Sequence, residues 1–301
     1  MRITGLALIL LLLPVSAAAY RDDVLQQLTF LAAKRFNRCV EGTAIPRLTA
    51  LQVRNLVRGN LAEADANVLR RATRWSYYDR SDQEDRRVLG FINTSMHERF
   101  EDRSARVLET SPLRDALRYE DLGTVIHYLQ SVTIPADVVP IFHPRPWRWP
   151  SGDRFSNYPV DLEALTESVS DLCLEVLATP EDANFESILN RTAALTMAAI
   201  RSPISDMQAS WHVFWEEDEP GRFGSYGIVG NSFGRAAHFP CGDAECHLLE
   251  DDPIYRDFAL AQHRLAVLST MRAVLVLQRF ALARDNAIEI ANDDGEGAAP
   301  D

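Results

Sequence analysis

The stretch HYLQSVTIPADVVPIFH, His127 to His143, carries the strongest indication of how this chain folds. His127 and Ser131 are four residues apart, so they share one face of a helix. Pro135 then ends that helix, because proline has no backbone N–H to continue the hydrogen-bond ladder. Asp137 follows six residues after Ser131. The spacing is typical of a metal-binding helix, but serine and aspartate stand where aspartate and histidine would be expected.

Most other long segments repeat apolar residues with the period of a helix. Residues 23–40 place Leu25, Leu28, Phe30 and Phe36 on one broad face. Gly59-Asn60 is interpreted as a break between two short helices. Ser111 and Pro112 are typical of a helix start, and Asp252 caps the last helix. Helices are therefore expected over residues 48–60, 64–75, 82–100, 111–132, 161–177, 181–200 and 253–283.

Strand signals are poor, and two irregular regions remain, residues 135–159 and 216–252. The second contains GRFGSYGIVGNSFG, which lacks the preceding strand and the Gly-Lys-Ser/Thr ending of a phosphate-binding loop. A surface loop is the preferred interpretation. The sequence therefore predicts an all-α fold: one helical-bundle domain over residues 20–291 with long irregular loops. A polar tail over 292–301 is expected to be disordered.

The first 19 residues have the pattern of a secretory signal peptide. Arg2 is followed by an apolar run too short to span a bilayer, and Ala17 to Ala19 offer a cleavage site before Tyr20. An uncleaved N-terminal anchor is the alternative. No later stretch is apolar for long enough to span a membrane, so we expect an exported chain, periplasmic or secreted, without a transmembrane span after cleavage.

The overall charge limits the classes of partner. The formal net charge is -12, spread along the chain, and 47% of the residues are apolar. Nucleic acids and anionic membranes attract electropositive surfaces. General nucleic-acid binding is therefore not expected, although a bound metal ion could still make one local site positive.

Four cysteines in an exported chain favour disulfides. Cys241 and Cys246 bracket CGDAEC, where Gly242 permits a short turn, and this leaves Cys39 to pair with Cys173. Three connectivities are open from sequence alone. A zinc site made by Cys241, Cys246, His238 and His247 is a further alternative, although its spacing matches no standard zinc motif.

Residues 122–141, LGTVIHYLQSVTIPADVVPI, resemble the superfamily of zinc-dependent phospholipases C and single-strand-specific zinc nucleases. That superfamily carries His-x-x-x-Asp, with a second histidine six residues beyond, just after a proline. Gly123, His127 and Pro135 match. Ser131 stands where the family has aspartate, and Asp137 where it has histidine. The resemblance implies an all-helical exported protein related to phosphodiesterases.

Two further segments extend the resemblance over roughly residues 65–158. In NLAEADANVLRRATRWSYYDR, Asp65 takes the family's acidic position and Ser76 replaces a histidine ligand. In SGDRFSNY, Gly152 and Ser156 have the spacing of the family's His-x-x-x-Glu pair. Ser76, Ser131 and Ser156 thus mark replaced ligand positions.

The resemblance implies zinc as cofactor, but the surviving ligands are few. Asp65 and His127 stand at ligand positions and Asp137 is a carboxylate substitute, so these three residues are the expected metal ligands. One catalytic zinc usually takes three protein ligands, and an oxygen-rich set would also suit Mg²⁺ or Ca²⁺. The alternatives are that no metal binds and that His127 is a core histidine.

An anion contact is the other candidate site. HPRPWRWPSGDRF holds Arg145, Trp147, Arg148 and Trp149, with Asp153 close by in sequence. Arginine and tryptophan side chains could stack and hold an anionic head group. The alternative is a loop anchored by its tryptophans, with Asp153 in a local ion pair.

Two functional classes follow from these residues. The first is a phospholipase C/nuclease-like descendant that is non-catalytic or weakly active and binds an envelope partner. The second is an active metal-dependent phosphodiesterase, with a reduced oxygen-rich site that hydrolyses phospholipid or nucleic-acid esters.

Overall fold

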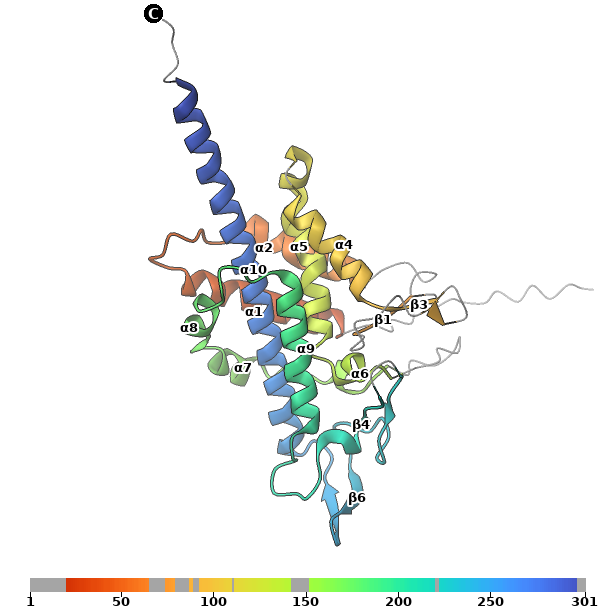
Figure 1. Ribbon diagram of the computed structural model, residues 1–301. Coiled ribbons are helices and arrows are strands. Elements are labelled where there is room, and N and C mark those ends of the chain that lie inside the picture. Colours follow the sequence, from red (N-terminus) through yellow and green to blue (C-terminus); the bar gives the residue numbers. More distant parts are fainter. Residues whose placement is uncertain are drawn as a thin grey trace, which may run out of the picture.

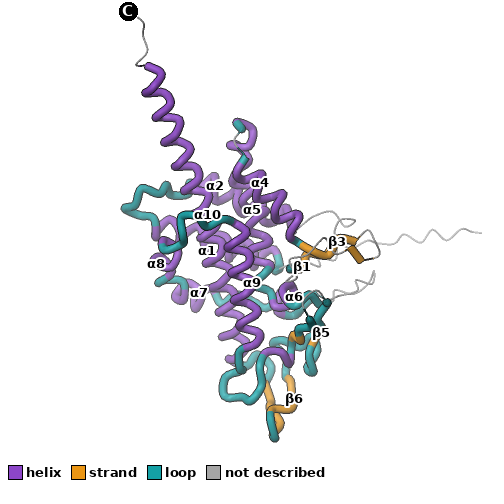
Figure 2. The backbone as a smooth tube through the Cα atoms, viewed as in Figure 1, coloured by secondary structure: helices purple, strands orange, loops and turns teal. Residues whose placement is uncertain are grey.

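The computed structural model describes residues 20–64, 74–78, 87–88, 92–109, 111–141, 152–219 and 222–296. The fold is mostly helical, as the sequence predicts, with three small sheets in addition (Figures 1 and 2). The signal-peptide prediction for residues 1–19 lies outside the described residues.

The helices are α1 Asp22–Cys39, α2 Ala50–Ala64, α4 His97–Leu108, α5 Pro112–Ser131, α6 Pro135–Val138, α7 Leu162–Ser168, α8 Leu172–Leu177, α9 Phe185–Arg201 and α10 Pro253–Glu296. Two 3-10 turns, Phe155–Asn157 and Trp211–Val213, lie in the connections. The single helix expected over residues 161–177 is wrong, because the chain turns between α7 and α8.

Helix α10 runs through the length of the bundle, with α1, α5 and α9 packed around it (Figure 1). Their shared core is apolar and includes Leu28, Leu129, Ala193 and Leu275. Fully burying one such leucine side chain contributes about 1.5 to 3 kcal/mol, so this four-helix contact adds to the stability of the fold. Helices α2 and α4 cover the outer side of α5.

Several helix starts follow from local sequence. Pro112 opens α5 as expected, and the Asp252 carboxylate accepts a hydrogen bond from the backbone N–H of Ile254 at the start of α10. Asn184 and Ser187 form a capping box before α9, in which each side chain accepts from the other residue's backbone N–H. These contacts satisfy donors that a helix N-terminus leaves unpaired.

The contact between α2 and α5 depends on two glycines. A Cβ atom on Gly59 would lie 1.9 Å from the carbonyl oxygen of Glu120, and one on Gly123 would lie 2.3 Å from that of Leu56. The two backbones therefore touch where neither helix has a side chain. Gly59-Asn60 does not separate two helices, so that expectation is wrong: α2 continues to Ala64.

We expect Gly59→Ala to lower the free energy of unfolding by about 3 kcal/mol, because the added methyl group forces the two helices apart. Alanine favours an isolated helix by about 1 kcal/mol over glycine, so helix propensity alone gives the opposite sign. Gly152→Ala is the matched control, since its Cβ would meet only ordinary contacts at 3.7 Å and beyond. Urea unfolding measures the free energy of unfolding of both variants. An unchanged or raised value in Gly59→Ala would contradict the close approach of α2 to α5.

The strands correct two predictions. β1 Arg74–Tyr77, β2 Arg87–Val88 and β3 Ile92–Ser95 form one sheet in the order β1-β3-β2, where helices over 64–75 and 82–100 were expected. β1 and β3 are parallel, and β2 and β3 antiparallel. Within the predicted loop 216–252, β4 Trp215–Glu216 pairs with β5 Ser225–Tyr226, and β6 Ala237–Cys241 with β7 Ala244–Leu248.

Both disulfides pair as expected. Cys39 at the end of α1 bonds to Cys173 in α8, and Cys241 bonds to Cys246 across the β6–β7 hairpin. The alternative zinc site at Cys241 and Cys246 is therefore wrong, because a metal ligand must be a free thiolate.

Helix α10 reaches Glu296, five residues into the tail expected to be disordered, and its C-terminal end projects beyond the other helices (Figure 1). Residues 253–286 of this helix are long and apolar enough to cross a membrane by length and composition. Its most apolar window is 67% buried inside the bundle, which is also the property of a core helix in a soluble protein.

Candidate functional site

His127 lies in α5 within a buried hydrogen-bond network. Its Nδ1 is 3.2 Å from Oδ1 of Asn60, on α2. The Asn60 amide nitrogen donates to Thr29 Oγ1 and Gln130 Oε1, each at 2.9 Å. The Gln130 amide nitrogen in turn donates to Thr29 Oγ1 and to Thr270 Oγ1. The network joins α1, α2, α5 and α10, and it is possible because Gly59 and Gly123 let α2 approach α5.

The network also fixes the tautomer of His127. Both amide hydrogens of Asn60 are used on Thr29 and Gln130, so its Oδ1 is an acceptor and His127 Nδ1 must carry the donated hydrogen. Burial lowers the pKa of His127, and the nearby Glu63 only partly opposes this. A neutral imidazole held by its Nδ1–H is therefore the folded form.

Glu63 is the carboxylate whose charge acts on His127. It accepts hydrogen bonds from the Tyr128 hydroxyl at 2.6 Å and from Arg103 Nη2 at 3.0 Å. Burial alone would raise the pKa of Glu63, but the Tyr128 hydrogen bond and the Arg103 charge together bring it below its usual value. Glu63 is thus ionised in the folded chain, and its carboxylate joins α2 to Arg103 of α4 and Tyr128 of α5.

Ser131 and Asp137 do not face the same surroundings as the His127 ring. The Ser131 hydroxyl is buried and donates to the backbone carbonyl of His127 at 2.9 Å, as serines in helix interiors often do. Asp137 is the third residue of α6, and its backbone oxygen accepts a hydrogen bond from the N–H of Tyr78. Its charge acts on the phenols of Tyr20 and Tyr226, whereas the charge acting on His127 is that of Glu63.

Asp153 is a buried carboxylate among aromatic residues. Its Oδ1 accepts from the Phe155 N–H at 2.9 Å, and its Oδ2 accepts from Trp215 Nε1 at 3.0 Å and the Tyr226 hydroxyl at 3.2 Å. Burial raises the pKa of Asp153, and these bonds offset the shift only in part. The Ser156 hydroxyl donates to the Asp153 carbonyl at 2.7 Å, so it closes the same turn.

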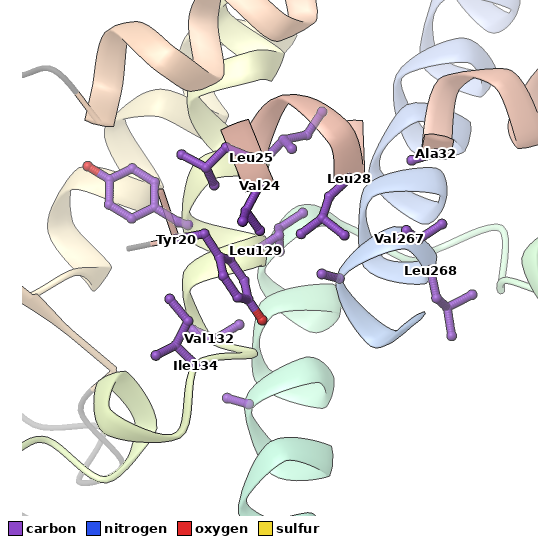
Figure 3. Packing of buried hydrophobic residues seen from close by; sticks show 14 of the residues in the cluster. Tyr20, Val24, Leu25, Leu28, Ala32, Leu129, Val132, Ile134, Val267 and Leu268 are labelled. Carbon is purple, nitrogen blue, oxygen red and sulfur yellow. The ribbon is translucent and has the colours of Figure 1, made fainter. Parts of the chain in front are cut away.

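Tyr20 docks beside this turn at the start of the described chain. Its side chain is fully buried, and its hydroxyl lies 2.9 Å from Thr133 Oγ1. The Arg21 backbone N–H donates to the Ser156 carbonyl. Figure 3 shows that Val24, Leu129, Val132 and Ile134 surround the Tyr20 ring. The Tyr20 ring also lies against the rings of Phe155 and His263.

Five of the predicted site residues lie outside the part of the chain that the structure describes. Asp65 lies outside the described residues, and so do the anion-contact residues Arg145, Trp147, Arg148 and Trp149. Ser76 lies in β1. Asp153 and Arg154 do not pair with each other among the described residues: the Asp153 carboxylate accepts from Trp215 and Tyr226, and Arg154 Nε donates to the Phe233 carbonyl.

The described residues do not fit the zinc cluster that the resemblance implies. Among them, no three His, Cys, Asp or Glu side chains come together as metal ligands. Ser131 and Ser156 direct their hydroxyl hydrogens at carbonyl groups, and His127 uses one ring nitrogen on Asn60. The metal triad of Asp65, His127 and Asp137 stays a prediction, since Asp65 is not placed.

Sequence reasoning missed the residues that surround His127. Thr29, Asn60, Gln130 and Thr270 come from four separate helices. The available signal was a polar residue inside each apolar stretch, as in QLTFL and YLQSV. Buried polar groups need partners, but which partner each finds depends on how the helices pack.

Comparisons with protein families, with curated proteins and with solved structures give no match to this chain.

We expect His127→Ala to lower the free energy of unfolding by about 2 to 4 kcal/mol, because it leaves a cavity and an unpaired Asn60 oxygen. His127→Gln keeps a donor and should lose less. Both losses should be the same with and without a chelator in urea unfolding. If the chelator alone lowers wild-type stability to that of His127→Ala, the ring is held by a metal ion instead.

Proposed function

We propose that this chain is an exported, phospholipase C/nuclease-like helical protein that does not use its ligand-like positions for catalysis. It acts as a binding module for an envelope partner. The observation that carries the proposal is the His127–Asn60 hydrogen bond within a buried network. The residue that matches the family's ligand helix best is therefore a core residue.

The chemistry of the neighbouring positions supports the same conclusion. Metal-dependent phosphodiester hydrolysis needs an ion with an open position, held by about three protein ligands. Ser131 and Ser156 are neutral hydroxyls bonded to backbone carbonyls. The Asp153 carboxylate accepts three hydrogen bonds from protein donors. These hydrogen bonds give each of the three groups a partner within the protein, and among the described residues no three His, Cys, Asp or Glu side chains gather around one point.

Export is supported by the disulfides and by the position of Tyr20. Disulfides form and persist in oxidising compartments, and the chain has two. Tyr20 is buried against Thr133 and Phe155, so the segment after the proposed signal peptide starts as part of the folded body. The net charge of -12 disfavours a polyanionic partner, so we propose an envelope protein as the partner.

The catalytic alternative is tested by hydrolysis assays on the chain lacking residues 1–19. The substrates are a chromogenic phosphodiester, single-stranded DNA and phosphatidylcholine vesicles, each with added Zn²⁺, Mg²⁺ or Ca²⁺. We expect no turnover above that of the metal ion alone. Turnover that disappears in His127→Ala and Asp137→Asn, while the folded fraction is unchanged, would show that the chain is an active phosphodiesterase.

A further inference from the structure

The hairpin of β6 and β7 places two exposed histidines directly opposite each other. His238 pairs with His247 in the antiparallel register, and the two rings are stacked, with centroids 6.1 Å apart and planes 21° apart. Both residues are exposed. The hairpin extends from the end of the helical body near β4 (Figure 1).

The hairpin holds this pair on its solvent face. Phe239 and Leu248 point to the opposite face and are buried. Side chains alternate along a strand, so His238, next to Phe239, and His247, next to Leu248, lie on the solvent-facing side of the hairpin. The Cys241–Cys246 disulfide closes the hairpin next to the turn at Gly242, whose φ is +65°. Backbone pairing and a covalent bond thus fix the positions of the two Cα atoms that carry the imidazoles, and the rings themselves can rotate.

We propose that His238 and His247 form a surface site for a divalent first-row transition metal, with Cu²⁺ bound more tightly than Zn²⁺. Imidazole is the commonest metal ligand, and metal–nitrogen bonds are about 2.0 to 2.1 Å long. Directly opposite residues in an antiparallel pair have Cβ atoms about 4.5 to 5.5 Å apart. Rotation of the exposed rings about their side-chain bonds therefore lets both reach one ion.

The remaining coordination positions belong to water. The described residues place no third histidine, cysteine or carboxylate with this pair to complete a closed protein site. Glu245 lies on the same face, two residues before His247, and adds negative charge that attracts a cation. Copper is preferred over zinc because nitrogen ligands follow the Irving–Williams order. Such a site would take up or deliver an ion at the surface and is independent of the proposed loss of catalysis.

Calorimetric titration of the oxidised chain, prepared without an affinity tag, tests the site with Cu²⁺ and Zn²⁺ salts. We expect one Cu²⁺ per chain and affinity lowered on the order of a hundredfold in His238→Ala and in His247→Ala, since each removes one of two protein ligands and even the loss of a residue that only supports a ligand costs about 10- to 100-fold. His212→Ala, outside the hairpin, should bind like the wild type. Thermal unfolding of the two hairpin variants without metal should match that of the wild type, because the His238 and His247 rings are exposed.

Either of two results overturns the proposal. The first is wild-type affinity and stoichiometry in both hairpin variants. The second is loss of the bound ion in His127→Ala with retention in His238→Ala, which would place the ion in the helical core and would also contradict the proposed function. A failure of the hairpin site alone leaves the proposed function intact, because the His127 network does not involve β6 or β7.

Discussion

A chain carrying Cys39→Ser and Cys173→Ser should lose about 4 to 5 kcal/mol of unfolding free energy. The bond joins positions 134 residues apart, so it removes a large loop entropy from the unfolded chain. It also ties the end of α1 to the short α8, which has few residues of its own to bury. Urea unfolding of the oxidised proteins measures the loss.

The second disulfide supplies the matched control. Cys241 and Cys246 are five residues apart, and the same chain-entropy argument gives only about 2 kcal/mol for Cys241→Ser with Cys246→Ser. Equal losses for the two double variants would contradict the argument. They would show that native contacts, and not the unfolded chain, determine how much each bond contributes.

Asp153→Ala should lose about 4 kcal/mol, because it leaves the Phe155 N–H, Trp215 Nε1 and the Tyr226 hydroxyl without their acceptor inside the core. Asp153→Asn keeps one acceptor oxygen and the shape of the side chain, so its loss at neutral pH should be about 1 to 2 kcal/mol. Asp182→Ala, at an exposed position, is the control and should be neutral.

The pH dependence of Asp153 has a defined sign. Because burial raises its pKa in the folded state above the ordinary 3.8, the folded chain binds more protons than the unfolded chain in this range. The wild type therefore loses stability from this group as the pH rises from 3.8 through the raised pKa. Asp153→Asn removes that loss, so its stability relative to wild type should improve with pH. A constant difference from pH 3 to 7 in urea unfolding would contradict the raised pKa.

The helical class could be predicted from sequence, because periodicity is a local property. The long apolar stretches of α1, α5, α9 and α10 give their helices directly. Within α1, however, Phe30 is 45% exposed although its spacing places it on the predicted apolar face. Periodicity identifies a broad face, and only the neighbouring helices decide where that face ends.

The errors occur where tertiary contacts override local preference. Gly59 predicts a break in the helix. Helix α2 nevertheless continues to Ala64, because the missing side chain lets its backbone pack against the backbone of Glu120 in α5. The strands β2 and β3 lie in a stretch with a helix-like acidic start. Short strands such as these are defined by their pairing partners, and sequence periodicity over two to four residues cannot show pairing.

The candidate site was predictable only in part. The sequence predicts a ligand position at His127 and replaced ligand positions at Ser131 and Ser156, by a resemblance that stays a prediction, and the structure shows what each side chain contacts. The sequence cannot show that Asn60 from α2 contacts the His127 ring, since that contact depends on the glycines that bring the two helices together. Whether a histidine such as His127 binds a metal or a core residue such as Asn60 is determined by how the helices pack.

We infer that the His127 ring is held by its hydrogen bond to Asn60 and not by a metal ion. The most direct test is the zinc content of the chain lacking residues 1–19, with His238→Ala and His247→Ala introduced so that the hairpin cannot contribute. After incubation with Zn²⁺ and dialysis, we predict no stoichiometric zinc. One or more zinc ions per chain, lost when His127→Ala is added, would contradict the account and make the helical core a metal centre.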